Sequence, residues 1–323
     1  MKQYPKISIL ICVYNRPKMT SMCLKSILQQ EYNGEVEILL IDGGSDKNTL
    51  GLLKNYEKKY PQVQIIYNKK RLPEGYGYGK WLGWKKSTGE LIAIVDNDNI
   101  LQNKFCIKNM TDALLQEKDS FGCACELEYN SHNNFINRYI SLQGTDPFMA
   151  YNSLDGIIKI KKIGKDKGKY ILYEIDKKNP IITGGNCFIY KKNILDKLGG
   201  YTKDVENINK LIKSNYNKIV ISKLAKTNHL AVNGFLEFIR KKKKWAIEYA
   251  TPNETGSSYL SNKTGRKHFL INLFFISSVI PNIFIGSLMF AKDNKKEWLA
   301  LPFMKFLTLF IYALNIIETK LKN

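Results

Sequence analysis

The chain has 323 residues, enough for one large or two modest domains, and 44% of them are hydrophobic, which excludes global disorder. Its formal net charge of +21 favours a polyanionic partner, such as a nucleic acid, an anionic membrane surface or a phosphate-bearing substrate. The lysines are scattered along the whole chain, so a generally basic composition explains the same charge without any such partner.

The cysteine pattern favours reduced thiols in a protein core. The six cysteines are Cys12, Cys23, Cys106, Cys123, Cys125 and Cys187. Most of them lie inside apolar runs, and no second Cys or His pair stands at zinc spacing from Cys123 and Cys125. No apolar signal region precedes the first predicted strand, so we expect a protein that faces the cytosol.

Short apolar, β-rich runs alternate with segments of helical periodicity in the N-terminal third of the chain. These runs are residues 7–13, 36–41, 63–67 and 91–95. The alternation predicts an α/β domain with a mostly parallel central sheet, covered by helices on both faces. Three of the runs lead into polar residues (Asn15, Asp42 and Asp96), as a site along one edge of the sheet requires.

Asp96 and Asp98 directly follow the strand predicted over 91–95. They would stand at its carboxyl end, where ligands bind in open α/β sheets. Two carboxylates this close repel each other, and a divalent cation, Mg²⁺ or Mn²⁺, held together with substrate phosphates relieves the repulsion. The alternative is an ordinary polar turn, because Asp and Asn are common turn residues.

Several motifs occur in an order and at a spacing that resemble one known family. They are ISILICVYNRP, EILLIDGGSDKNT and GYGYGKWLGWKKSTGELIAIVDNDNIL. From about residue 5 to residue 235 the chain resembles the family 2 glycosyltransferases of the A-type fold. This resemblance implies a single Rossmann-like nucleotide-sugar-binding domain, a UDP- or GDP-sugar donor, a divalent metal and inversion at the anomeric carbon.

The resemblance also implies which residues bind the donor. These are Tyr14, Asn15, Arg16, Asp42, Lys80, Asp96 and Asn97. By the family's pattern Asp42 would face the base, although a carboxylate at a strand end also caps the following turn. Asp96 and Asp98 would hold the diphosphate through the metal, with Lys80 near the same group. Cys12 and Trp81 depart from the family, which often has proline and asparagine at these places.

Residues 129–181 have no clear periodicity and are predicted to form an irregular insertion on the acceptor side. After it, the glycine-bearing block with Gly184, Gly185 and Asn186 resembles the family's acceptor-binding turn, where glycines allow the backbone to approach a sugar. Further on, a histidine at the place of His229 can reach the metal or the diphosphate in the family. A lone histidine is otherwise a structural residue.

A general base toward the acceptor is expected from an acidic pair that the family carries near residue 206. Here the second position of that pair is Asn207, which cannot take a proton. Glu206 is our first candidate and Asp204 the second, although Asp204 could instead cap a helix predicted over 205–214. Loss of the base would leave a non-catalytic scaffold that binds a nucleotide sugar.

The C-terminal quarter indicates membrane attachment. Residues 240–244 are five consecutive cations, which suits an anionic lipid headgroup. Residues 269–290 carry no charge and 298–317 carry one, Lys305, so two spans joined by a short link would form a hairpin. The polar residues of 298–317 share one helical face, so the helices could instead lie along the membrane interface, and a buried hairpin of a soluble protein is the third possibility.

The sequence as a whole predicts a membrane-attached, metal-dependent, inverting glycosyltransferase with its catalytic domain on the cytoplasmic side. Its acceptor would be a polyprenyl phosphate or a lipid-linked glycan, and its further partners membrane lipids. The expected division is a donor half (1–120), an acceptor half (121–235), a basic segment (236–268) and C-terminal hydrophobic helices (269–323). A nucleic-acid-binding protein is not expected, because it would leave the apolar C-terminus unexplained.

Overall fold

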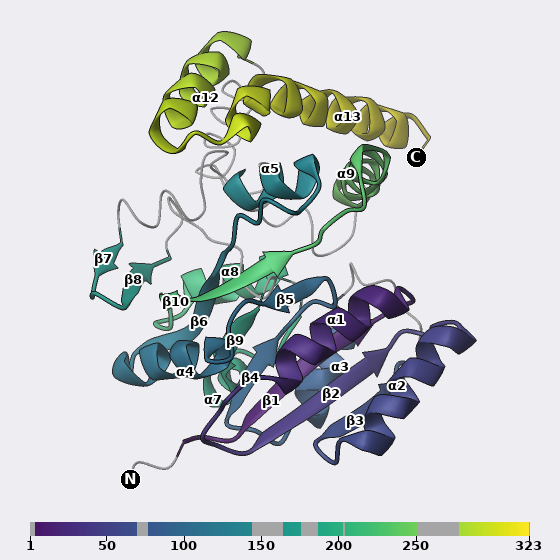
Figure 1. Ribbon diagram of the computed structural model, residues 1–323, viewed down its shortest axis with the longest axis vertical. Coiled ribbons are helices and arrows are strands. Elements are labelled where there is room, and N and C mark those ends of the chain that lie inside the picture. Colours follow the sequence, from purple (N-terminus) through teal and green to yellow (C-terminus); the bar gives the residue numbers. More distant parts are fainter. Residues whose placement is uncertain are drawn as a thin grey trace. The chain divides into compact units, whose positions relative to one another are not determined.

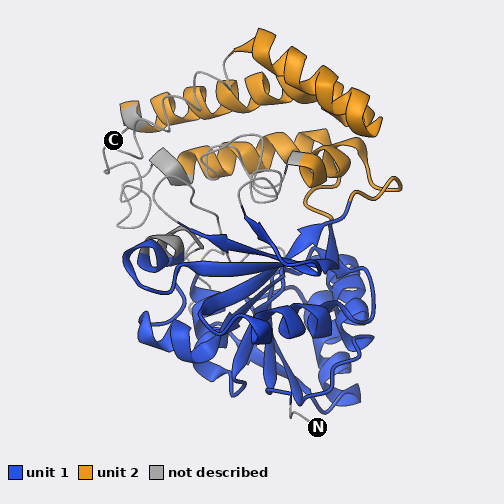
Figure 2. Cartoon of the chain, turned by 90° about the vertical axis from the view of Figure 1, so that its left-hand side faces the viewer, with its two compact units in different colours: residues 1–128, 159–176, 181–229 blue, residues 129–158, 177–180, 230–323 orange. Residues whose placement is uncertain are grey.

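The computed structural model describes residues 4–69, 77–143, 164–175, 187–202, 204–250 and 278–322. The chain divides into two compact units (Figure 2). We call residues 1–128, 159–176 and 181–229 the sheet unit, and residues 129–158, 177–180 and 230–323 the helical unit. The four-part division expected from the sequence stays a prediction.

The sheet unit is built on one ten-stranded sheet (Figure 1). Its strands are β1 (Ile7–Val13), β2 (Val36–Asp42), β3 (Val63–Tyr67), β4 (Leu91–Ile94), β5 (Asn99–Leu101), β6 (Ser120–Leu127), β7 (Lys165–Asp166), β8 (Tyr170–Glu174), β9 (Phe188–Lys191) and β10 (Lys218–His229). They lie in the order β3-β2-β1-β4-β9-β6-β10-β8-β7, and β5 pairs with β10 outside this path. β1, β2, β3 and β4 are all parallel, so their carboxyl ends meet at one edge.

Helices cover both faces of the sheet. They are α1 (Pro17–Leu28), α2 (Lys47–Lys59), α3 (Tyr78–Lys86), α4 (Cys106–Gln116), α7 (Lys192–Lys197) and α8 (Asp204–Lys213). Alternate residues of β1 explain the two layers, because successive side chains of a strand point to opposite faces. Ile9 and Ile11 pack with α1, α2 and α4 in one apolar cluster, whereas Leu10 packs with α3, α7 and α8 in the other. Both faces of the central strands are therefore buried, which explains their continuous apolar runs.

The expectation of a mostly parallel sheet is wrong, because the sheet is mixed. β9 lies antiparallel between β4 and β6, and β10 pairs antiparallel with β5 and β8 although it is parallel to β6. The prediction rested on β1, β2 and β3, each of which is followed by a helix that crosses over to a parallel strand. β7 and β8 are joined by a short connection, which requires antiparallel pairing.

β10 continues to His229, with a register irregularity between Ser222 and Lys226, which brings the end of this strand to the site. One further expectation needs correction. The segment 129–181 is not irregular throughout, because it contains α5 (Phe135–Gln143), β7 and β8. Periodicity missed these elements because each is short.

The helical unit has its own core. Besides α5 it contains α9 (Phe235–Ala250), α12 (Val279–Asp293), the 3₁₀-helix η2 (Lys296–Ala300) and α13 (Leu301–Lys322). Tyr139, Phe238 and Met304 from three of these helices pack into one buried apolar cluster. Arg138 of α5 pairs with the buried carboxylate of Glu297 at 2.5 Å, which ties α5 to η2.

Candidate active site

A tight turn between β4 and β5 places both predicted metal-binding carboxylates. The Val95 amide donates to the Leu10 carbonyl, so the chain leaves β4 beside β1. The Asn99 amide then donates to the Asp96 carbonyl at 3.0 Å and closes the turn that holds Asp96 and Asp98. The two carboxylates therefore stand just beyond the carboxyl end of β4, as the sequence predicted.

The far end of β10 brings His229 to Asp98. In the antiparallel pairing of β10 with β5, His229 is the partner of Asn99, the residue next to Asp98. His229 Nε2 lies 3.5 Å from Asp98 Oδ1, and the two side chains are 18% and 11% exposed. Asp98 Oδ1 also accepts a hydrogen bond from the Asn99 side-chain amide at 3.2 Å. Two of the three predicted metal ligands, far apart in sequence, are thus in contact.

The other carboxylate faces a lysine. Lys80 Nζ of α3 lies 3.3 Å from Asp96 Oδ1, and it lies 6.0 Å from the centroid of the fully buried Tyr201 ring. One turn further along α3, Trp84 Nε1 donates to Asp196 Oδ1 at 2.8 Å and the Trp84 ring covers Gly200. α3 is therefore fastened to α7 through Asp196 and to the residues after it through Gly200, and these contacts position the helix that carries Lys80.

The glycines of α3 serve packing. A Cβ atom on Gly79 would lie 2.9 Å from Cys12 Sγ, and one on Gly83 would lie 3.0 Å from Ile41 Cδ1. Both glycines let α3 approach β1 and β2 closely, which positions Lys80 relative to the sheet. The sulfur of Cys12, which replaces a proline common in the family, fills the space left by Gly79.

The loop after β1 is unusual in its backbone. Asn15 and Arg16 both adopt left-handed conformations, with φ of 56° and 63°, which few non-glycine residues do. The Asn15 amide donates to Ser45 Oγ at 2.9 Å, and Asn15 Oδ1 accepts from the Asp46 amide at 2.9 Å. The loops after β1 and β2 are thus joined, and the neighbouring Tyr14 is left 54% exposed at the edge.

Asp42 caps the turn after β2, which is one of the two roles that the sequence analysis considered. Its carboxylate accepts from the amides of Gly44 and Ser45 at 3.2 and 3.1 Å, and the residue is 4% exposed. These bonds shape the loop after β2. The predicted contact between Asp42 and the nucleobase is not tested by them and stays a prediction.

Two groups support the β4–β5 turn from beneath. The Asn97 side-chain amide donates to Thr20 Oγ1 of α1 at 3.3 Å, so Asn97 anchors the turn to α1. The Cys23 thiol donates to the Asp96 carbonyl at 3.6 Å. Burial, followed by the nearby charge of Asp98, raises the pKa of Cys23 well above its usual value, so this group stays a thiol and acts only as a donor.

The site fits a divalent cation that is shared with a substrate. Among the residues the structure describes, no three His, Cys, Asp or Glu side chains come together to hold a metal ion. The pair of Asp98 and His229 nevertheless supplies a carboxylate oxygen and an imidazole nitrogen at one point. Both donors suit Mn²⁺, and Mg²⁺ also accepts one or two carboxylates when phosphate oxygens complete its coordination. The residues therefore suit a cation held jointly with a diphosphate, not one enclosed by protein.

A comparison with family models decides the identity. Residues 8–199 match the model described as Glycosyl transferase family 2, which is more than half of the chain. The chain belongs to glycosyl transferase family 2. The two carboxylates after β4 and Lys80 all lie inside the matched region.

Curated relatives of this family 2 protein include an uncharacterized glycosyltransferase of Rickettsia bellii, 30% identical over 142 residues, and glycosyltransferase GlyG of Streptococcus pneumoniae, 29% identical over 143 residues. The matches cover 44% and 43% of this chain, and 17% and 44% of the relatives. The chain thus spans less than half the length of either relative.

Solved structures agree on the fold. Mannosyltransferase PcManGT from Pyrobaculum calidifontis, in complex with GDP-Man and Mn²⁺, aligns with a TM-score of 0.56 at 14% identity, over 98% of this chain and 88% of its own. GalNAc-T7, solved with UDP, GalNAc and Mn²⁺, aligns with a TM-score of 0.51 at 13% identity, over 83% and 55%. This likeness confirms the predicted A-type glycosyltransferase fold.

The acceptor side of this family 2 protein is only partly described. Gly184, Gly185 and Asn186 lie outside the described residues. Both candidate bases belong to the first turn of α8, which begins at Asp204, one residue before the predicted helix start, and their side chains are not described. The choice between Glu206 and Asp204 therefore stays open.

Asn207, which replaces an acidic residue of the family, is a structural residue here. It is 2% exposed, and its Oδ1 accepts from the amide and the hydroxyl of Thr202 at 3.2 and 3.1 Å. These bonds tie Thr202, just before α8, to a side chain in the first turn of the helix. An aspartate would accept the same two bonds, so the asparagine keeps them while it replaces the charge by an amide NH₂ group that makes no hydrogen bond to the residues that the structure describes.

Sequence reasoning missed three supporting residues. Tyr201 lies under Lys80, Ser45 accepts from Asn15, and Cys23 donates to the turn of Asp96. Adjacent glycines before Tyr201, both with positive φ, were the one available sign that this segment makes a sharp bend. No local pattern marks Ser45 or Cys23, because each acts on a residue distant in sequence.

Proposed function

We propose that this protein is a metal-dependent, inverting glycosyltransferase that moves a sugar from a UDP- or GDP-sugar to a lipid-linked acceptor. The observation that carries this proposal is the pair of contacts at the edge of the sheet, Asp98 with His229 and Asp96 with Lys80. Two carboxylates in one turn, one paired with an imidazole and the other with an ammonium, suit a bound cation and a diphosphate.

The donor class rests on the fold and on what its neighbours bind. PcManGT was solved with GDP-Man and Mn²⁺, and GalNAc-T7 with UDP and Mn²⁺. The joined loops after β1 and β2, with exposed Tyr14 between them, are where we place the nucleotide. Arg16, held in its left-handed conformation at the start of α1, would line the same pocket.

The proposed reaction is a displacement at the anomeric carbon of the donor sugar. The acceptor oxygen attacks the anomeric carbon from the side opposite the diphosphate, so the new bond forms as the bond to the diphosphate breaks and the configuration inverts. Glu206 or Asp204 takes the proton of a hydroxyl acceptor, whereas a phosphate acceptor already carries negative charge and needs no base. Lys80 stabilises the charge that develops on the leaving diphosphate.

A divalent cation held by Asp98, His229 and Asp96 would neutralise further charge on that diphosphate. Asp96 would then be shared between the cation and Lys80, whose ammonium is already 3.3 Å from it. The Asn97 amide also holds the turn through its bond to Thr20, and its contact with the donor stays a prediction.

Membrane attachment through the helical unit is part of the proposal. α12 and α13 expose large apolar side chains in a helical repeat: Ile280, Ile283, Phe284 and Leu288 on α12, and Phe303, Phe306, Phe310, Leu314 and Ile317 on α13. We call this set the apolar face. The polar residues of α13 lie on the opposite side, where Lys305 is 2% and Thr308 3% exposed. Such an arrangement suits a helix with one side in lipid.

One described helix, Lys296–Thr319, is long and apolar enough to cross a bilayer, and 39% of its apolar window is buried inside the protein. Part of the other predicted span, residues 269–277, lies outside the described residues. Exposed Arg240, Lys243 and Lys244 on α9 would meet anionic headgroups. We place the sheet unit on the cytoplasmic side, where such cations are enriched.

Donor binding tests the core of the proposal. In a thermal-shift panel of nucleotide sugars with Mn²⁺, we expect one UDP- or GDP-sugar to stabilise the wild-type protein, and Asp98→Asn to remove both this stabilisation and donor turnover. Asp119→Asn, an exposed carboxylate in the same unit, is the matched control and should change neither. Metal-independent turnover, or full activity of Asp98→Asn, would overturn the assignment, and binding without turnover would indicate a scaffold.

A further inference from the structure

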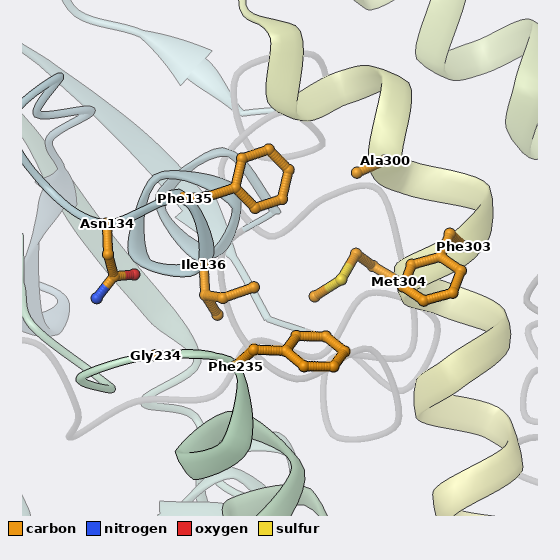
Figure 3. A pocket seen from close by; sticks show the side chains of 8 residues that line it. All are labelled: Asn134, Phe135, Ile136, Gly234, Phe235, Ala300, Phe303 and Met304. Atoms are coloured by element: carbon orange, nitrogen blue, oxygen red, sulfur yellow. The ribbon is translucent and has the colours of Figure 1, made fainter.

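A cavity of about 310 Å³ lies within the helical unit. Figure 3 shows the side chains of Phe135, Ile136, Phe235 and Met304 gathered around one space, with Phe303 and Ala300 completing its wall. The lining comes from α5, the start of α9, η2 and α13. Its volume is at the lower end of the range found for small-molecule sites.

Among the described residues that line the cavity, Asn134 alone has a polar side chain. Its amide donates to the Val232 carbonyl at 2.8 Å, and its Oδ1 accepts from the Asn137 amide at 2.9 Å. Both ends of this side chain are therefore satisfied by protein. An apolar lining of this kind favours apolar groups over polar ones.

The cavity is continuous with the apolar face. Phe303 belongs to both, because it lines the cavity and is 59% exposed. Phe135 and Phe235 also line the cavity while remaining 39% and 40% exposed, so aromatic rings surround its opening. An apolar chain that enters past Phe303 would therefore meet aromatic rings at the opening.

Charge complementarity indicates what the chain carries. α9, whose first residue Phe235 lines the cavity, presents the exposed cations Arg240, Lys243 and Lys244 further along. An anionic headgroup attached to a bound chain would find these cations in the same unit. A hydrocarbon chain that ends in a phosphate matches both features, whereas a neutral lipid matches only the first.

We propose that this cavity binds the hydrocarbon chain of a phosphate-bearing lipid, the lipid-linked acceptor of the reaction. That this lipid is the acceptor rests on the proposed function. Binding of the chain itself requires no donor, no metal and no turnover, so it can be measured separately. An isoprenoid and a fatty alkyl chain share the required chemistry.

The test uses the full-length protein in lipid nanodiscs with two probes, farnesyl phosphate and dodecyl phosphate, each with a photoreactive group at the chain end. After irradiation we expect labelled peptides from α5, α9 and α13 that contain cavity-lining residues. Stronger labelling by one probe identifies the chain as isoprenoid or alkyl. Labelling confined to the outward side of α12 would overturn the proposal, because it would mean contact with bulk lipid only.

Variants that fill the cavity sharpen the test. A Cβ atom on Gly234 meets no heavy atom within 4 Å, so Gly234→Leu should fold and occupy the space, and Ala300→Leu fills it from the other side. Each excluded methylene group weakens binding by a factor of about four, so we expect roughly tenfold weaker labelling. Gly51→Leu on exposed α2, also in open space, is the matched control and should label like the wild type.

The outcomes separate this inference from the proposed function. Unchanged labelling in both filling variants would overturn the cavity site even if sugar transfer to a lipid acceptor occurs. If both filling variants lose the label but the wild-type protein transfers no sugar to the lipid, the cavity binds the hydrocarbon chain and the lipid is not the acceptor. Melting temperatures near the wild-type value would show that the variants are folded.

Discussion

The two units of this protein place their polar and apolar side chains in opposite ways. In the sheet unit the apolar residues form two buried layers, and the charged groups of the site stand at the edge of the sheet. In the helical unit α13 buries Lys305, Thr308 and Asn315 while it exposes Phe306 and Phe310. The first arrangement is that of a protein in water, and the second suits contact with a lipid phase.

The proposed function assigns a different role to each unit. Asp96, Asp98, Lys80 and His229 all belong to the sheet unit, to which we assign the diphosphate chemistry. The helical unit contributes apolar surface, to which we assign contact with a membrane or a lipid chain. Four experiments, in order of decreasing expected effect, can break or sharpen this contrast.

Thiol reactivity measures how closed the core of the sheet unit is, because all six cysteines belong to it. Burial raises the pKa of Cys106 to about 12 and also raises that of Cys123, so neither forms a reactive thiolate near neutral pH. We expect an aromatic disulfide reagent to modify half-buried Cys12 at least about a thousandfold faster than the others. Cys12→Ser should abolish the fast phase, and a second fast thiol would mean that this core opens readily.

Replacing Lys80 by methionine tests whether the edge of the sheet unit carries the chemistry. The variant keeps the length and the apolar stem but loses the ammonium beside Asp96. We expect sugar transfer to fall about a hundredfold, because one preorganised charge at the leaving group is lost. Lys86→Met, an exposed lysine at the end of the same helix, should retain wild-type rates. Equal transfer rates for the two variants would show that Lys80 has no part in the reaction.

Exposed phenylalanines in the two units should behave differently toward lipid. Phe306→Ser and Phe310→Ser each remove a ring from the apolar face, and we expect each to weaken partition into phospholipid vesicles roughly tenfold. Phe105→Ser, which changes an exposed ring of the sheet unit, should leave partition unchanged. Co-sedimentation measures the three variants side by side. A similar loss for Phe105→Ser would contradict a membrane role confined to the helical unit.

The cations of α9 should contribute the smallest effect per residue replaced. Each cation near an anionic surface adds about 1 kcal/mol of attraction, so replacing Arg240, Lys243 and Lys244 by glutamine should weaken binding to anionic vesicles about fivefold per charge. Binding to neutral vesicles should not change, and high salt should remove the difference. The triple replacement of Lys47, Lys54 and Lys58 by glutamine on exposed α2 removes as much charge from the sheet unit. If the α2 replacement weakens binding to anionic vesicles as much as the α9 replacement does, the attraction depends on net charge and not on the position of the cations.

The site could be predicted as far as its parts follow from local patterns. Apolar runs that end in Asp42 and Asp96 were sufficient to place both residues at the carboxyl edge, because parallel strands bring these ends together whatever the rest of the fold. The approach of His229 to Asp98 could not be derived from these patterns. It depends on antiparallel pairing of β10 with β5, between residues far apart in sequence.

The sheet shows the same limit. Crossover helices in the N-terminal half require parallel strands, and this part of the prediction holds. β9 lies antiparallel between β4 and β6, and no periodicity within the strand Phe188–Lys191 indicates its direction. A strand carries the same alternating pattern in either orientation.

By itself the sequence determined the family, the order of the first strands and helices, and the two carboxylates at a strand end, since each depends on neighbouring residues alone. Tertiary structure alone decided which face of α13 is covered and which is open. The same apolar composition fits a soluble core, a membrane span or an interfacial helix, and only packing against α9 and α12 buries Lys305 and leaves Phe306 outside. The free energy of burying a side chain depends on what surrounds it, and the neighbours of α13 are distant in the chain.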